Sequence, residues 1–172
     1  MMKLKKLKIP TENDWNTLEH DKPRDQVASL DRQHAKLNFL GKSFTDAFDM
    51  FDENIGKYMT HFWDMPRACF KYYYLALIAY LRNVPENYVY DDTDYPKDYA
   101  CASDTVFSTL EYRLQHYPDG LGNVLYEDGV MDDLEYIANN QTLYDADIDI
   151  FDNYKDRLSK IKKTCDEKGI KY

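Results

Sequence analysis

The chain has 172 residues and a formal net charge of −9, and 44% of its residues are hydrophobic. This length and hydrophobic content suffice for one globular domain with a buried core, which argues against a disordered chain. The negative charge argues against direct binding to DNA or RNA, because that affinity comes mainly from Lys and Arg side chains that neutralise phosphates. A basic protein or a divalent cation fits the charge better.

Acidic side chains are concentrated in the middle of the chain. Residues 43–156 carry 7 basic and 23 acidic side chains, a net charge of −16, whereas residues 1–42 and 157–172 have net charges of +3 and +4. Such a field can steer an oppositely charged partner and raise its association rate, although salt screens it beyond roughly 10 Å. The alternative is a surface that only keeps the protein soluble.

The sequence predicts a cytoplasmic protein. Cys69, Cys101 and Cys165 lie far apart and lack the spacing of a zinc site or a disulfide framework, which suits a reducing compartment. The opening MMKLKKLKI is not followed by the apolar run of a signal peptide, and no stretch reaches the roughly 20 apolar residues of a membrane span. We expect a basic N-terminal segment, residues 1–10, then one helical domain, residues 11–172, with no membrane partner.

The first predicted helix covers residues 21–41. Asp21 is a suitable capping residue, Pro23 fits the first turn, and Gly41 is a stop signal. Apolar positions recur between them at helical spacing, and we expect this stripe to face the core. The stripe consists of Val27, Leu30, His34 and Leu37. On this face His34 is expected to be a hydrogen-bonded core residue rather than a ligand.

The second predicted helix begins at Ser43, a good capping residue, and places Asp46 in the first turn, where a carboxylate suits the helix dipole. Its apolar residues follow one helical stripe, formed by Phe44, Phe48, Phe51, Ile55, Tyr58 and Phe62. Acidic residues fall beside this stripe and predict an exposed acidic flank, formed by Asp46, Asp49, Asp52 and Glu53.

The third predicted helix, residues 66–83, should lie at the centre of the fold. From Cys69 to Leu81 its only charged residue is Lys71, and a helix that is apolar all round belongs in the interior. We expect Asp64 to cap it and Pro66 to occupy its first turn. Its buried centre should comprise Leu75, Leu77, Ile78 and Leu81. Val84-Pro85 ends it, because the residue before proline avoids helical torsions.

A long acidic, Tyr-rich connector, residues 84–102, follows this helix. It contains the stretch VYDDTDYPKDYAC, in which Tyr90, Tyr95 and Tyr99 alternate with Asp91, Asp92, Asp94 and Asp98. Connectors of this length are uncommon in compact domains unless they are functional or ordered by their own side chains. Three interpretations remain open, namely an ordered connector, an acidic patch that faces a partner, and a cation-binding loop.

The rest of the chain predicts three further helices. One begins after Ser103 and ends near Pro118, a short one contains Met131, and the last ends at Gly169. The last helix has an apolar stripe of Phe151, Tyr154, Leu158, Ile161 and Cys165, and its start is crowded by Asp145, Asp147, Asp149 and Asp152. The sequence therefore predicts an all-α, single-domain helical bundle of about six helices around the central apolar helix, residues 66–83.

The closest approach to a metal motif is DADIDIFDNYKD. Asp145, Asp147 and Asp149 match the first three ligand positions of a calcium loop. The match then fails, because Ile150 stands where a glycine must form the sharp turn and Asp156 stands where a bidentate Glu is usual. We therefore predict no metal site and no cofactor.

No catalytic signature stands out. Cys69 lies in an apolar helix where thiols are inert, and Cys101 is the only cysteine in a predicted loop. The histidines, His20, His34, His61 and His116, do not pair at metal-ligand spacing. We expect the protein not to be an enzyme.

Two functional hypotheses remain. The first is a small acidic intracellular module that inhibits or neutralises a basic protein, such as a nuclease, a nucleic-acid-processing enzyme or a toxin, by stoichiometric binding. It would resemble immunity proteins, antitoxins or nucleic-acid mimics in mode of action. The second is a helical enzyme or divalent-cation-binding domain that uses the clustered carboxylates. A plain structural subunit and a homodimer also stay open.

The predicted partner-binding residues of the first hypothesis combine tyrosines, which are favoured at binding hot spots, with clustered acids. They are Tyr90, Asp91, Asp92, Asp94, Tyr95, Asp98 and Tyr99 of the connector, Asp46, Asp49, Asp52 and Glu53 of the acidic flank, and Asp145, Asp147 and Asp149 before the last helix.

Overall fold

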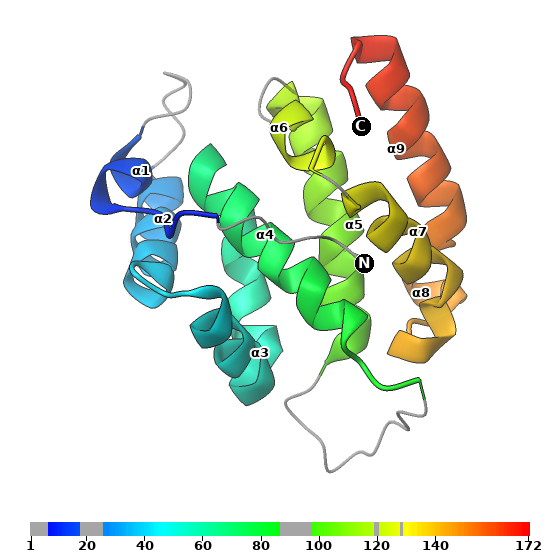
Figure 1. Ribbon diagram of the computed structural model, residues 1–172, viewed down its shortest axis with the longest axis horizontal. Helices are drawn as coiled ribbons and strands as arrows, with labels where there is room; N and C mark the ends of the chain where they lie inside the picture. The colour runs from blue at the N-terminus through cyan, green and yellow to red at the C-terminus, as the bar shows by residue number, and fades with distance from the viewer. Residues whose placement is uncertain (1–6, 18–25, 87–97, 119–120, 128) are drawn as a thin grey trace.

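The fold is built around α4 (Arg67–Arg82), which lies in the middle of the molecule (Figure 1). The computed structural model describes residues 7–17, 26–86, 98–118, 121–127 and 129–172. As the sequence predicts, α4 is buried nearly all round, and Leu75 and Leu81 are at most 1% exposed. The predicted cap is wrong by two positions, because Pro66 is the N-cap and Asp64 ends the preceding turn.

Four elements pack on one side of α4. They are α1 (Glu12–Asn16), α2 (Gln26–Phe39), α3 (Phe44–Met59) and the 3-10 turn η1 (Thr60–Trp63). The cap of α3 is confirmed, since Ser43 Oγ accepts from the Asp46 N–H at 3.2 Å and Asp46 Oδ2 accepts from the Ser43 N–H at 2.7 Å. The helix is interrupted at Asn54, but its predicted stripe still faces inward.

The other side of α4 is formed by the C-terminal half of the chain. Its elements are α5 (Tyr99–His116), α6 (Gly122–Leu125), α7 (Val130–Asn139), the 3-10 turn η3 (Gln141–Tyr144), α8 (Ile148–Phe151) and α9 (Tyr154–Lys168). Helix α7 packs against both α4 and α9, and α5 lies between α4 and α9. Gly169 ends α9 in a left-handed conformation, as predicted.

Tyrosines form much of the core instead of standing over it. Tyr73 and Tyr74 are fully buried on α4, and Tyr144 and Tyr154 are at most 1% exposed. Each hydroxyl finds a partner in the interior, such as the Val106 carbonyl at 2.9 Å from Tyr74 Oη. Burial without such a bond would cost the desolvation free energy of the hydroxyl.

The predicted inner face of α2 is wrong. Leu30 is 53% exposed, Leu37 is 81% exposed and His34 also lies on the surface. Ala35 and Phe39 face inward instead, and the Phe39 ring lies 4.7 Å from the ring of Tyr73. Helix α2 packs at the edge of the fold against η1, and the bulky ring of Phe39 fixes its orientation more strongly than Leu30 and Leu37 do. The side chain of Val27 and the predicted cap and first turn, Asp21 and Pro23, lie outside the described residues.

The described part of the chain is all-helical and contains no strand, which confirms the predicted fold class. Six of its helices have ten or more residues, in agreement with the predicted number. Among the described residues, no helix combines the length and the apolar character needed to cross a membrane.

Candidate protein-binding surface

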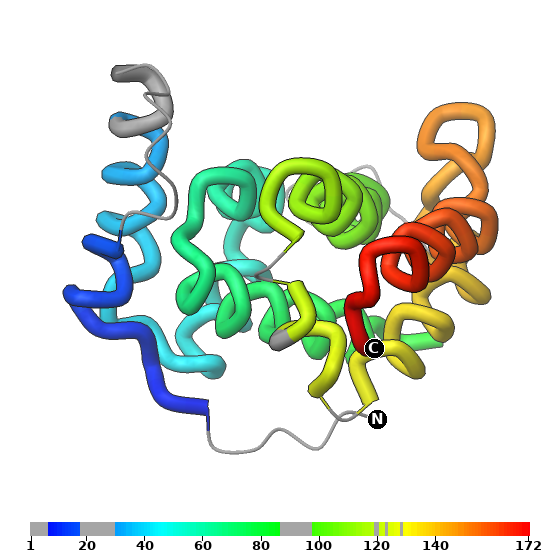
Figure 2. The backbone as a smooth tube through the Cα atoms, turned by 90° about the horizontal axis from the view of Figure 1, so that it is seen from above, coloured from blue at the N-terminus to red at the C-terminus, as the bar shows by residue number. Residues whose placement is uncertain are grey.

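Residues 145–152, here called the acidic loop, combine exposed acidic and exposed apolar side chains on the described surface. Its sequence, DADIDIFD, contains four Asp and no Lys or Arg. Asp145, Asp147 and Asp149 are exposed, and Ile148 and Ile150 are 51% and 73% exposed between them. Figure 2 shows this segment, in orange, standing out from the body of the molecule at the upper right.

The backbone of the acidic loop is not the continuous helix that the sequence predicts. Helix α8 makes a single turn, and α9 begins only at Tyr154, capped by Asn153 Oδ1 at 2.9 Å from the Lys155 N–H. Asp145 has φ 55° and ψ 27°, and Asp152 has φ 61° and ψ 174°. The second conformation is close to a region that essentially only glycine populates, and such strain concentrates at functional sites.

Buried side chains on both sides hold the acidic loop in place. Tyr144 precedes it and donates to the Leu81 carbonyl at 3.3 Å, and Ala146 within it is 4% exposed. Tyr154 follows it, with its hydroxyl 3.0 Å from Ser103 Oγ. Because the loop is fixed at its start and its end, it cannot rearrange to bury Ile148 and Ile150, and both side chains stay exposed.

A polar clamp closes the C-terminal end of the acidic loop. Arg157 binds Glu111 with two hydrogen bonds of 2.9 and 2.7 Å and also pairs with Asp104. The same guanidinium donates to the Phe151 carbonyl at 3.4 Å. Burial lowers the pKa of Arg157, but the hydrogen bonds to Glu111 and Asp104 outweigh it and raise the pKa above its ordinary value. The clamp thus ties the loop to α5.

A hollow of about 490 Å³ lies beside the loop, and Ile150 and Phe151 form the apolar part of its lining. Its polar lining is formed by Asp104, Glu111, Asp152, Arg157 and Lys160. Three carboxylates against two cations leave the hollow slightly negative. A projecting apolar residue next to an acidic hollow is chemically suited to a basic protein surface, which offers both aliphatic stems and positive charges.

The acidic flank of α3 has a more structural character. Asp46 is occupied by the helix cap, where hydrogen bonds from the backbone N–H and hydroxyl of Ser43 hold its pKa below the ordinary value. Asp52 accepts from Tyr80 Oη at 3.1 Å. Asp49 and Glu53 are exposed. Only part of the predicted flank is therefore available to a partner.

Tyr99, one of the predicted partner-binding residues, is buried at the start of α5. Helix α5 begins at Tyr99 and not after Ser103 as predicted, because Asp98 Oδ1 caps it at 2.8 Å from the Cys101 N–H. Tyr99 is 7% exposed and its ring lies 5.9 Å from that of Tyr80. Asp98 likewise serves the helix start. The other predicted residues of the connector, Tyr90, Asp91, Asp92, Asp94 and Tyr95, lie outside the described residues.

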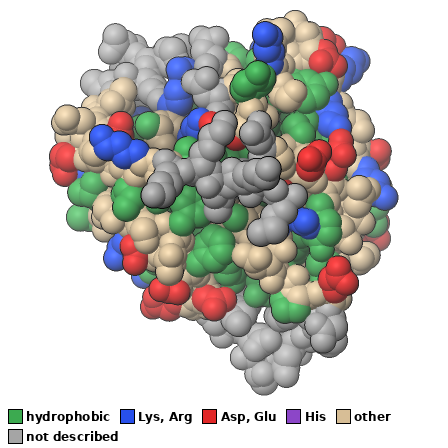
Figure 3. All heavy atoms as spheres, in the orientation of Figure 1, with side chains coloured by type: hydrophobic (Ala, Val, Ile, Leu, Met, Phe, Trp, Pro, Cys, Tyr) green, Lys and Arg blue, Asp and Glu red, His purple; other side chains and the backbone are tan. Residues whose placement is uncertain are grey.

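The acidic flank of α3 and the acidic loop do not form one continuous face. Helix α3 and α8 lie on opposite sides of the molecule with α4 and α5 between them, in both Figure 1 and Figure 2. On the face drawn in Figure 3, acidic, basic and hydrophobic side chains are interspersed. The acidic loop therefore stands as a separate local feature, and its exposed isoleucines were not among the predicted binding residues. The alternation of Asp and Ile at positions 147–150 was the available signal.

The carboxylates and thiols of the described residues can be examined as metal ligands and nucleophiles. Within the described ranges, no three His, Cys, Asp or Glu side chains are grouped so that they could hold a metal ion. Cys101 lies in the first turn of α5 and not in a loop, and burial, followed by the influence of Asp98, raises its pKa to about 12. A thiol with such a pKa is a poor nucleophile near neutral pH.

No family model matches this chain, and no curated protein or solved structure matches it either.

Proposed function

We propose that this protein is a stoichiometric binding module for a basic protein and that the acidic loop is the part that docks. One observation carries the proposal: Ile148 and Ile150 are exposed on a strained, clamped backbone beside three exposed aspartates. Full burial of a fully exposed isoleucine is worth about 1.5–3 kcal/mol, and Ile148 and Ile150, which are 51% and 73% exposed, would each gain a corresponding part of it. Because the loop is already ordered, little of that gain is lost to ordering on binding.

The aspartates of the acidic loop would favour a positively charged partner. Among the described residues, Asp145, Asp147 and Asp149 form no ion pair with a Lys or Arg side chain, so their field is free to act on a partner. Such charges mainly raise the association rate and select against acidic surfaces. The partner class is a nuclease, a nucleic-acid-processing enzyme or a toxin, whose basic surface the module would cover in the manner of an immunity protein or antitoxin. Cys69, Cys101 and Cys165 form no disulfide bond, which suits a cytoplasmic setting.

The proposal is tested by using the protein to capture a basic protein from a lysate of the native host. The complex is then reconstituted from the two purified proteins. The wild-type chain is compared with the Ile148→Ser, Ile150→Ser variant, which should lose at least tenfold in affinity. The matched control is Leu30→Ser, Leu37→Ser, which removes two equally exposed aliphatic side chains from α2. If the control weakens the complex as much as the loop variant does, the acidic loop is not the docking element.

Association kinetics test the role of the charges. Asp147→Asn with Asp149→Asn removes two charges but retains the cap of α8, because Asn caps helices as well as Asp. The expected result is slower association with little change in dissociation. Asp49→Asn with Glu53→Gln on α3 changes the net charge by the same amount at a distant site. Equal effects of the two pairs would show that only net charge matters.

A further inference from the structure

We propose that this protein self-associates head to tail, with the acidic loop of one copy docking into a groove at the C-terminal end of α9 of the next. The proposal uses the same loop as the proposed function, but it does not depend on the existence of a basic partner. It is carried by a second surface, at the far end of α9, whose chemistry complements the loop.

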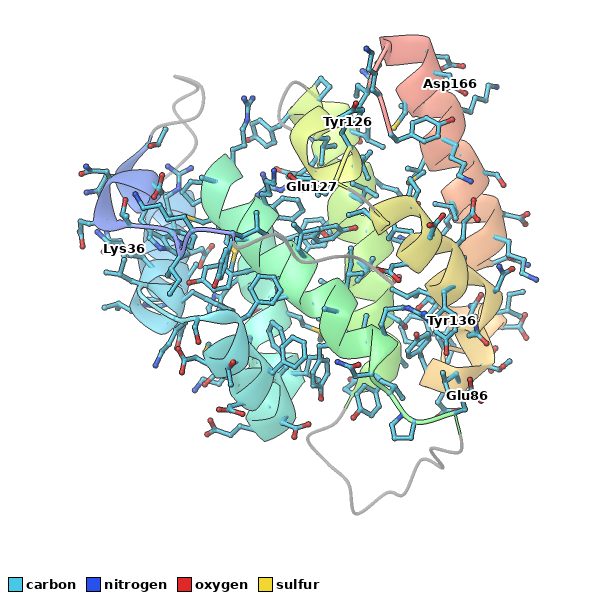
Figure 4. The ribbon with its side chains drawn as sticks, in the orientation of Figure 1. Lys36, Glu86, Tyr126, Glu127, Tyr136 and Asp166 are labelled. Carbon is cyan, nitrogen blue, oxygen red and sulfur yellow. The ribbon has the colours of Figure 1, made fainter. Side chains whose placement is uncertain are left out.

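The groove has a volume of about 740 Å³ and lies between the end of α9 and α6. Its apolar lining comes from Pro118, Tyr126 and Ile170. Tyr126 is 69% exposed. Figure 4 shows Tyr126, the residue directly after α6, and Asp166 on α9 at the same end of the molecule. The groove thus offers an aromatic surface that nothing in the described chain covers.

Two lysines give the groove a positive rim. Lys168 and Lys171 line it and are exposed, and neither forms an ion pair with a described residue. Gly169, with φ 66°, turns the chain back so that the Ile170 N–H donates to the Cys165 carbonyl at 2.9 Å. Asp166 accepts from Tyr172 Oη at 3.1 Å and does not line the groove. An acidic segment with aliphatic side chains fits this lining.

The acidic loop is a segment of that kind, with exposed Ile148 and Ile150 between exposed aspartates. It cannot reach the groove of its own chain, because α9 separates them by 15 residues, which is about 22 Å of helix. Figure 1 shows α8 and the C-terminus at opposite ends of α9. The contact therefore joins two copies through different surfaces, and repetition of it yields open chains or rings.

The expected association is weak. A single loop in a groove buries less than the roughly 1,200 Å² of a stable interface, and the net charge of −9 repels a second copy. We expect oligomers only at high protein concentration. A basic protein that binds the acidic loop should dissociate the oligomers, because the partner contact and the contact between copies use the same isoleucines.

Charge reversal in sedimentation-velocity experiments tests the proposal. The loop-reversed variant carries Asp145→Lys and Asp149→Lys and keeps Asp147, which caps α8. The groove-reversed variant carries Lys168→Glu and Lys171→Glu. Wild type should form species larger than a monomer at high concentration, and each variant alone should remain monomeric. An equimolar mixture of the two should associate again, because each restores the complement that the other lacks. Asp49→Lys with Glu53→Lys is the control and should behave as wild type.

The outcomes separate this proposal from the proposed function. A wild type that stays monomeric up to about 1 mM, corresponding to less than about 4 kcal/mol of binding free energy, overturns self-association. A monomeric mixture of the two variants overturns the pairing of loop and groove. Groove reversal should leave binding of the basic partner unchanged, whereas loop reversal should abolish both contacts. If the variants associate as described but no basic protein binds the chain, self-association stands and only the proposed function is overturned.

Discussion

The side chain of Gln141 binds the backbone of Asp152, donating from Nε2 to its carbonyl oxygen at 2.7 Å, while Gln141 Oε1 accepts from the Tyr154 N–H at 2.9 Å. One amide therefore bridges the residue with the strained backbone and the first residue of α9. This bridge and the Arg157 clamp explain how a loop with two exposed isoleucines keeps one conformation.

Replacing the strained residue should stabilise the protein. Asp152→Gly removes a side chain from a backbone at φ 61° and ψ 174°, and we expect a gain of about 1 kcal/mol after the entropy of the unfolded chain is included. The melting temperature should rise by about 2–4 °C for a chain of this size. Thermal unfolding followed by circular dichroism measures it.

Asp149→Gly is the matched control for that change. Asp149 lies in the single turn of α8, where glycine should destabilise by about 0.5–1 kcal/mol. If Asp152→Gly also lowers the melting temperature, the conformation of Asp152 is not a source of strain.

Loss of the Arg157 clamp should destabilise the protein strongly. Arg157→Met leaves Glu111 and Asp104 without their cation, and we expect a loss of about 2–3 kcal/mol, less than for a fully buried pair because both acids are partly exposed. Urea denaturation gives the free energy of unfolding. Lys160→Met, on the exposed side of the same helix, should change stability by less than about 0.5 kcal/mol. Similar losses in the two variants would contradict the clamp.

The cap of α3 should contribute to acid sensitivity. The backbone and hydroxyl of Ser43 lower the pKa of Asp46 in the folded protein. A group with a depressed folded pKa stabilises above its unfolded pKa of about 3.9 and loses that contribution as the pH falls through the folded pKa. The stability difference between wild type and Asp46→Asn should therefore shrink below about pH 4. Asp49→Asn is the control, and a difference that stays constant down to pH 2 would contradict this assignment.

The thiols should react slowly in the native protein. Burial raises the pKa of Cys101 to about 12 and that of Cys165 to about 11, and Cys69 is fully buried. At pH 8 the thiolate fraction of either shifted group is about one in a thousand or less. Labelling with a disulfide reagent at pH 8 should be slow in the folded state and fast in urea. Rapid labelling of Cys101 in the folded protein would contradict its raised pKa and would make it a candidate nucleophile.

Strong local signals made the centre of the fold predictable from the sequence. The apolar run of α4 and the Ser43 cap of α3 each depend on neighbouring residues alone, and both are confirmed. The inner face of α2 was not predictable in this way. Helical spacing identifies a stripe, but the insertion of Phe39 beside Tyr73 decides which side turns inward, and that contact joins distant parts of the chain.

The candidate site was only partly predictable. Asp145, Asp147 and Asp149 were identified from their charge, and the structure places them together on an exposed loop. The burial of Tyr99 could not be decided from the sequence, because a tyrosine has the same chemistry in a core as at an interface and its packing on Tyr80 depends on tertiary structure. The positive φ of Asp152 has no strong sequence signal, since Asp is less typical of such positions than glycine.

The central claim, that the acidic loop docks a basic protein, is tested most directly by site-specific photocrosslinking in the native host. A photoreactive amino acid is placed at Ile150, which is 73% exposed, and for comparison at Leu37, which is 81% exposed. The account predicts a discrete crosslinked product with a basic protein from position 150 and none from position 37, and the product should weaken when Asp147 and Asp149 are changed to Asn. Crosslinking of that partner from position 37 but not from position 150 would contradict it.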